Sequence, residues 1–245
     1  MSTSSTDLAI DTGTKLGKIG QAFYFHPDTV ARGQELGMKP FQFYGLGRGG
    51  VLGDVDNSVV HSAFGYFHPA MIDHVVGGAR ELIGARECGR EYMECARNLG
   101  RATFADLEGL AEFSEAAEAL ADIIDGTALT LYVATAAEPL CADLPGRAMQ
   151  HAVALREWRG SVHLVAIVGS GLDPVRAHVV KRPDDYAMFG YRDEMVEATE
   201  QERAAHEAAE GTTNEICSAA LAKLTDEQRT AYAAGVDAMA AALGI

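Results

Sequence analysis

Apolar residues recur at mixed spacings of three and four along most of the chain, which is the periodicity of amphipathic helices. The clearest run covers residues 107–124, and Gly126 follows it as a stop signal. Thr225 and Gln228 form a capping box that predicts the start of a C-terminal helix. The same periodicity predicts further helices over residues 86–99, 148–158, 194–224 and 227–243.

Alternating β-branched runs, which are typical of half-buried strands, are scarce. The short apolar runs 129–134 and 162–168 lack strict alternation and lie between helical patterns, so we interpret both as buried helices. The expected fold class is therefore all-α. We expect a helical front half, residues 7–140, that contains a glycine-rich loop, and a helical back half, residues 145–245, with long C-terminal helices.

Composition narrows the class of protein. The chain has 245 residues, and 48% of them are hydrophobic, which is typical of a folded globule. No run approaches the roughly 18 apolar residues that a membrane span needs. Residues 1–6 lack the features of a signal peptide, and we expect them to form a loose tail. The four cysteines contain no Cys-x-x-Cys pair, so we expect a cytoplasmic protein without disulfides.

The charge balance bears on the partners. The net charge is -15, with 35 acidic and 20 basic residues. Because affinity for nucleic acid comes largely from Lys and Arg that neutralise phosphates, this balance argues against DNA as a partner. The sequence leaves any cofactor unknown, and a small apolar or anionic molecule is the expected partner.

A short phrase occurs twice in the front half. Each copy is an aromatic run that ends in His-Pro, with His26 before Pro27 and His68 before Pro69. Because Pro is favoured in the first turn of a helix, we expect both histidines at helix entrances beside aromatic surface. A titratable group next to an apolar pocket is what a small-molecule site needs.

The run from Gly45 to Gly50 matches Gly-x-Gly-x-x-Gly. Dinucleotide binding would also need a surrounding βαβ unit, which the sequence does not predict, so we expect a flexible connection instead. Arg48 within the run has two interpretations. It is either a surface residue or a clamp for a carboxylate or phosphate beside an aromatic pocket.

Histidines gather after this run. His61, His68, His74 and Asp73 lie within fourteen residues, and such side chains bind zinc or iron. However, no His-x-x-x-His or Glu-x-x-His pair is present, so no metal site is specified. The alternative is that each histidine caps a helix or lies satisfied in the core.

A third polar cluster lies in the back half. Trp158, the single tryptophan, stands among Arg156, Glu157, Arg159 and His163. The cluster is either an ion pair with a helix cap or one wall of a ligand pocket, and the sequence leaves both open.

These motifs together resemble a known family. The resemblance rests on five stretches of the sequence, namely Tyr24–Asp28, Gly47–Gly53, Val59–Phe64 with Phe67–Pro69, Leu155–Ala166 and Gly171–Asp173. As a set they resemble a large actinobacterial family, mostly of uncharacterised proteins, that is described as helix-turn-helix. The resemblance implies a helical front part and a winged-helix-like back part. Its tri-helical element would cover about residues 145–210, with Gly169–Gly171 as the turn.

The chain departs from the family pattern in three places. Arg-Gly-Ser-Val-His at 159–163 replaces the usual Arg-Gly-Asp-Gly-His, and His61 stands where a small or hydroxyl residue is expected. No two-stranded wing is predicted, because residues 191–223 continue as one acidic helical pattern. Since a recognition helix needs basic residues, the back half is expected to be a degenerate winged helix.

Three functions remain in view. The leading hypothesis is a small-molecule pocket lined by Tyr24, His26, Arg48, His61, His68, Trp158, Arg159 and His163. If the protein turns its ligand over, we expect cofactor-independent acid–base chemistry of the hydratase, isomerase or lyase type. In that chemistry His61 or His68 would be the base, and Arg48 or Arg159 would stabilise an anion.

The alternatives are a ligand-responsive transcription regulator and a metal or haem protein with ligands from His26, His61, His68 and His163. For each function we expect a homodimer formed through the long C-terminal helices.

Overall fold

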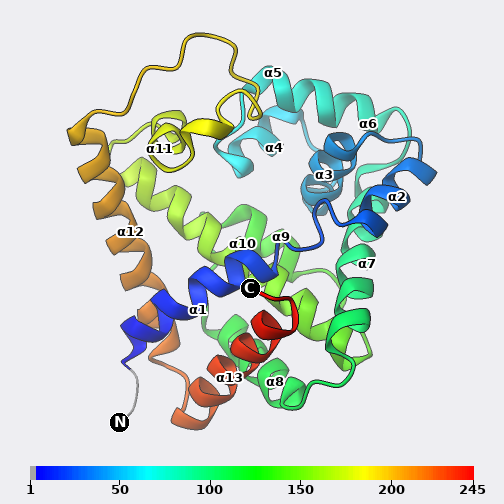
Figure 1. The fold of residues 1–245 in the computed structure, drawn as a ribbon, viewed down its shortest axis with the longest axis vertical. Helices are drawn as coiled ribbons and strands as arrows, with labels where there is room; N and C mark the ends of the chain where they lie inside the picture. The colour runs from blue at the N-terminus through cyan, green and yellow to red at the C-terminus, as the bar shows by residue number, and fades with distance from the viewer. Residues whose placement is uncertain (1–3) are drawn as a thin grey trace.

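The computed structural model describes residues 4–245, and the regular structure in that range is helical throughout (Figure 1). The all-α prediction is confirmed. Residues 1–3 of the expected tail lie outside the described range, but Ser4 caps the first helix and residues 5 and 6 belong to it, so the tail prediction was wrong there. The α-helices are α1 (Ser5–Ile19), α2 (Pro27–Glu35), α3 (Pro40–Gly49), α4 (Asn57–Phe64), α5 (Pro69–Ile72), α6 (Gly78–Arg80), α7 (Ala85–Phe104), α8 (Leu110–Ile123), α9 (Thr130–Ala136), α10 (Leu144–Gly169), α11 (Pro174–Lys181), α12 (Glu200–Leu221) and α13 (Asp226–Ala242).

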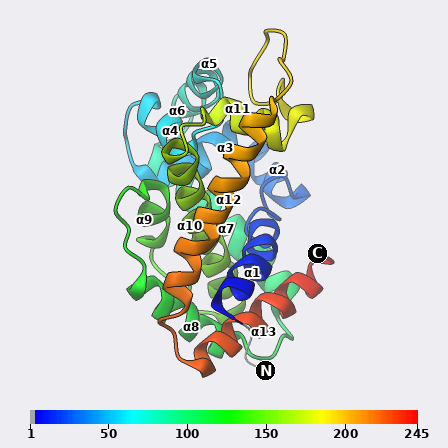
Figure 2. The same cartoon turned by 90° about the vertical axis from the view of Figure 1, so that its left-hand side faces the viewer.

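The long helix α10 forms the centre of the molecule. It packs against α7, α8, α9, α12 and α1, and Figure 2 shows α1 and α12 side by side in front of it. One apolar core runs from Leu8 in α1 to Ala240 in α13. The two expected halves therefore share a core, and their division near residues 140–145 stays a prediction.

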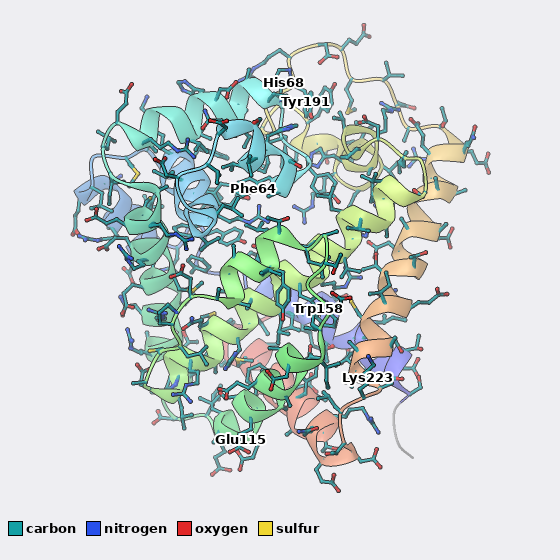
Figure 3. The ribbon with its side chains drawn as sticks, turned by 180° about the vertical axis from the view of Figure 1, so that it is seen from behind. Phe64, His68, Glu115, Trp158, Tyr191 and Lys223 are labelled. Atoms are coloured by element: carbon teal, nitrogen blue, oxygen red, sulfur yellow. The ribbon has the colours of Figure 1, made fainter. Side chains whose placement is uncertain are left out.

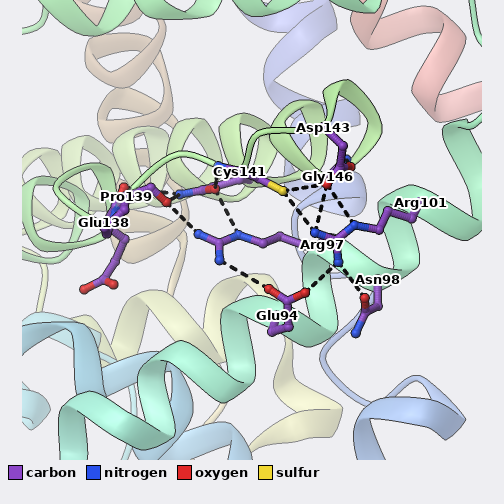
Figure 4. Close-up of polar contacts among 10 residues, drawn as sticks. Glu94, Arg97, Asn98, Arg101, Glu138, Pro139, Cys141, Asp143 and Gly146 are labelled. Atoms are coloured by element: carbon purple, nitrogen blue, oxygen red, sulfur yellow. Dashed lines mark hydrogen bonds and ion pairs between the residues drawn. The ribbon is translucent and has the colours of Figure 1, made fainter.

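A polar network fixes the beginning of α10 against α7 (Figure 4). The Gly146 N–H donates to Oδ1 of Asp143 over 2.9 Å and so caps the helix. The Cys141 thiol and the Arg101 guanidinium donate to Oδ2 of Asp143 over 2.9 and 3.0 Å. Both bonds hold the pKa of this carboxyl well below its usual range. Arg101 also donates to Glu94 of the same helix over 2.6 Å, so this arginine joins α7 to the segment that precedes α10.

The glycine-rich run is not the flexible connection that the sequence predicts. It forms the second half of α3 and continues into a 3-10 turn, Gly50–Leu52. A Cβ on Gly47 would lie 2.5 Å from Cγ of Tyr92, and Gly50 abuts the backbone of Ala85. The glycines therefore allow α3 to approach α7 closely, and this packing stabilises a helix of low intrinsic propensity.

Most predicted helices are confirmed, and the C-terminal helix has the predicted capping box. The run 162–168 is helical, but Val165 and Val168 are 43% and 61% exposed, so its interpretation as a buried helix was wrong at these positions. The helix predicted from residue 194 begins only at Glu200, because Thr199 and Glu202 form a capping box there.

Candidate functional site

A cavity of about 730 Å³ opens between the front part of the molecule and helices α10, α11 and α12. This volume is in the range of small-molecule sites. Much of its lining is aromatic. The rings include those of Tyr24, Phe25, Phe41, Tyr44, Phe64 and Phe67.

The cavity is cationic although the protein is acidic. Two carboxylates, those of Glu157 and Glu210, line it. Against them stand six cationic side chains, those of Lys18, Arg48, Arg156, Arg159, Lys181 and Arg182. Since the whole chain has a net charge of -15, the positive charge is concentrated where a ligand would lie.

The central polar contact joins α3 to α10. Arg48 donates from Nε to Oε1 of Glu157 over 2.9 Å and from Nη2 to Oε2 over 2.8 Å. Arg156 and the Tyr24 hydroxyl also donate to Oε1, over 2.8 and 3.1 Å. Burial alone would raise the pKa of Glu157, but the charges of Arg48 and Arg156 outweigh it and lower this pKa to about 2. Glu157 therefore stays ionised and holds both arginines in place.

Aromatic rings pack against the same arginines. The Arg48 guanidinium carbon lies 4.3 Å from the centre of the Phe64 ring, and Nη1 of Arg48 donates to the Tyr44 hydroxyl over 3.1 Å. The Arg156 guanidinium carbon lies 4.9 Å from the centre of the Tyr24 ring. Such contacts orient the guanidinium planes by cation–π attraction. This part of the cavity can hold a flat apolar group beside a positive charge.

A second polar cluster of the lining lies on α10 and α12. Arg159 donates to Oε2 of Glu210 over 3.0 Å. Nε2 of His163 lies 3.8 Å from Oε1 of Glu210, and the centre of the His206 ring lies 5.6 Å from that of His163. Burial lowers the pKa of His163 to about 4. Within residues 4–245, His163, His206 and Glu210 are the side chains whose placement could hold a metal ion.

Four of the eight predicted pocket residues line the cavity, namely Tyr24, Arg48, Arg159 and His163. Trp158 lies outside the lining, buried in the core. His68 contacts Tyr191 with a ring separation of 5.3 Å, far from Trp158 in Figure 3.

The other predicted histidines have local partners. Nδ1 of His26 accepts from the Asp28 N–H over 3.4 Å, and Nδ1 of His68 accepts from the Ala70 N–H over 3.1 Å. The predicted helix entrances are thus confirmed. Nε2 of His61 lies 2.9 Å from the carbonyl oxygen of Phe67. The catalytic roles assigned to His61 and His68 stay predictions, and neither side chain is part of the cavity wall.

His206 and Glu210 are not among the residues that the sequence predicts for the site. They are four residues apart on α12 and so share one helix face. This spacing was a usable signal, but the surrounding glutamates made the helix look like a solvated acidic surface.

A helix-turn-helix geometry is present at the edge of the cavity. Four residues, Ser170–Asp173, join α10 to α11, and Gly171 has a φ of 76° that glycine adopts without strain. Asp173 caps α11 by accepting from the Val175 N–H over 2.8 Å. Figure 1 shows α11 end-on while α10 crosses the view, so the two helices meet steeply.

Comparison with known proteins gives one match. A family model described as "Helix-turn-helix family" matches residues 11–195, a range that includes α10, the turn and α11. No curated protein and no solved structure matches the chain. The family match overturns the charge-based expectation that DNA is not a partner, because the helix-turn-helix is a DNA-binding motif. The winged-helix detail and the actinobacterial distribution stay predictions. In the described part of the chain, no helix combines the length and apolar character that a membrane crossing requires.

Proposed function

Because the chain belongs to the helix-turn-helix family, we propose that it is a DNA-binding regulator that responds to a small organic anion. One observation carries this proposal. Ala177, His178 and Lys181 of α11, the second helix of the motif, form part of the cavity wall. A bound molecule would therefore touch the same helix that a helix-turn-helix protein presents to DNA.

The lining supports an amphipathic anion as the ligand. An aromatic or aliphatic body fits among the aromatic rings of the lining, and a carboxylate or phosphate fits the cations. Arg48 and Arg156 already share Glu157, so we assign the anionic group to the cations of the lining that are exposed to solvent. Of these, Lys18 comes from α1, whereas Lys181 and Arg182 come from the end of α11.

The same cations provide a coupling between the ligand and DNA. Lys181 and Arg182 line the cavity and are also exposed to solvent. A DNA phosphate and the anionic ligand would then compete for them, so ligand binding is expected to weaken DNA binding. By linkage, DNA would weaken ligand binding by the same factor. Arg176 is not available for either, because it binds Glu202 over 2.6 and 2.9 Å.

A homodimer through the C-terminal helices is part of the proposal, because dimeric helix-turn-helix proteins read two half-sites. Light scattering coupled to size-exclusion chromatography measures it directly. The histidine chemistry predicted for His61 and His68 is not carried forward, since both lie outside the cavity lining.

DNA selection from a random fragment library at 50 mM salt tests the main proposal. The selected DNA is then titrated by fluorescence anisotropy against the wild type and a Lys181→Glu/Arg182→Glu variant. We expect binding that weakens steeply with salt, and at least a tenfold loss in the variant. Lys39→Glu/Arg90→Glu, which makes the same charge change at exposed front positions, is the matched control and should bind normally. No selected DNA at low salt, or equal binding by all three proteins, would refute the proposal.

The effector half is tested separately. A thermal-shift screen compares aromatic and aliphatic carboxylates and phosphates with their neutral amide and alcohol analogues. We expect only the anions to raise the melting temperature of the protein. Stabilisation by the neutral analogues alone would contradict the assignment of an anionic ligand. That result would not affect the proposal that the protein binds DNA.

A further inference from the structure

The cluster on α10 and α12 contains three side chains of the kinds that bind metal ions. His163 comes from α10, and His206 and Glu210 come from α12. Their potential ligand atoms all lie within 4.8 Å of one another. Ligands at about 2.0–2.1 Å from a zinc ion lie roughly 3.3 Å apart in a tetrahedral site. Small side-chain rotations on two packed helices would therefore close the set around one ion.

A hydroxyl group fixes the tautomer of His163. Thr213 donates its hydroxyl hydrogen to the Ala209 carbonyl over 2.7 Å, so its oxygen is left to accept. That oxygen lies 3.0 Å from Nδ1 of His163. Nδ1 must then carry the proton, and Nε2 presents a lone pair. Metal-binding histidines are typically oriented by such a hydrogen bond from the other ring nitrogen.

The lone pair of Nε2 faces another acceptor. Oε1 of Glu210 lies 3.8 Å away, while Oε2 of the same carboxylate accepts from Arg159. Two acceptors that face each other at this distance are stabilised by a cation or a donor placed between them. His206 approaches the same place from the next turn of α12, so the three side chains offer two imidazole nitrogens and a carboxylate oxygen to one point.

We propose that His163, His206 and Glu210 bind a divalent first-row transition metal ion, such as zinc, at the wall of the cavity. Two imidazoles and a carboxylate suit such ions, whereas magnesium and calcium prefer oxygen ligands alone. Three protein ligands leave a coordination position for water or for an anionic ligand. The metal titration below uses no DNA, so its outcome is separate from that of the proposed regulatory function.

Lys181 occupies part of the same space without the ion. Its Nζ lies 3.9 Å from Oε1 of Glu210, and its side chain is 61% exposed and free to turn outward. A like charge at this distance opposes a metal cation. Removal of the Lys181 charge should therefore tighten metal binding, an effect that a merely structural cluster would not show.

Titration of the untagged, EDTA-treated protein at pH 7.5 tests the site. Cobalt(II) serves as the spectroscopic probe, and zinc binding is measured by competition with a chromophoric chelator. We expect one equivalent of cobalt to produce ligand-field absorption, and zinc to displace it. His206→Ala and Glu210→Gln should each weaken binding at least tenfold, and Lys181→Met should strengthen it severalfold.

Two further variants make the test decisive. His178→Ala removes another buried histidine of the same cavity wall and should bind metal as the wild type does. Thr213→Val keeps the side-chain shape and removes the acceptor for His163, so it should weaken binding about 10- to 100-fold even if His206→Ala does not fold. Absence of a cobalt spectrum, or equal binding by the wild type, Glu210→Gln and Thr213→Val, would overturn the proposal.

Discussion

The buried carboxylate of Glu157 offers a quantitative test of how the cavity is held together. Its side chain is 3% exposed and accepts hydrogen bonds from Arg48, Arg156 and Tyr24. Glu157→Gln keeps the size of the side chain but removes its charge. Two largely covered guanidinium groups then lose their buried counter-ion, and breaking a buried ion pair typically costs about 3–5 kcal/mol. We therefore expect the free energy of unfolding at pH 7 to fall by an amount of that order.

The pH dependence follows from the same contacts. The pKa of Glu157 is about 2 in the folded protein and 4.5 in the unfolded chain. At about 1.4 kcal/mol per pKa unit, this difference contributes about 3 kcal/mol of stability. Because the folded-state pKa is the lower one, the contribution is complete above pH 4.5 and is lost as the pH falls from 4.5 towards 2. At pH 3 about 2 kcal/mol of it should be gone.

Urea unfolding followed by circular dichroism at pH 7 and pH 3 measures both effects. The difference in stability between the wild type and Glu157→Gln should shrink by about 2 kcal/mol at the lower pH. Glu115→Gln, at an exposed position of α8 (Figure 3), is the control and should match the wild type at both pH values. A pH-independent difference, or a loss below about 1 kcal/mol at pH 7, would refute the reasoning.

Three other predictions concern packing, capping and thiol reactivity. Gly47→Ala brings a Cβ to 2.5 Å from Cγ of Tyr92 and should cost about 1–3 kcal/mol in urea unfolding, whereas Gly17→Ala, with nothing within 4 Å, should cost nothing. Equal stability of the two variants would contradict the packing argument. Asp143→Ala removes the cap of α10 and should lower the free energy of unfolding by about 1 kcal/mol. Asp143→Asn keeps a capping oxygen and should be closer to the wild type, so a less stable Asn variant than Ala variant would disprove the capping role. Burial raises the pKa of Cys217 to about 11. Its thiol should therefore resist Ellman's reagent at pH 8 until the protein unfolds, and labelling of Cys217 in the native protein would contradict this.

Local signals in the sequence predicted local structure well. The capping box at Thr225 and Gln228 and the two His-Pro helix entrances depend on residues within one turn, and all are confirmed. The glycine-rich run failed because its helix depends on Tyr92, which is distant in sequence. Intrinsic propensity alone favours a loop there, and only tertiary packing reverses it.

The candidate site was predicted in part for the same reason. Arg48, Arg159 and His163 stood out by their neighbours in the sequence, and they line the cavity. His206 and Glu210 did not, because their contact with His163 depends on how α12 packs against α10. Net charge also predicted the partner poorly, because it sums over the whole chain and does not show the six cationic side chains gathered in the cavity lining.

The position of α1 has a consequence for the order of folding. This first helix packs on α12 and α13, where Thr6 contacts Ser218 over 3.2 Å and Lys15 contacts Asp237 over 2.6 Å. Its apolar face, with Leu16 and Ile19, is buried there in the finished protein. During synthesis that face can meet α10 before α12 and α13 have been made, but its contacts with α12 and α13 form only afterwards. The packing of α1 is therefore completed by contacts far apart in the sequence, which form slowly compared with local ones.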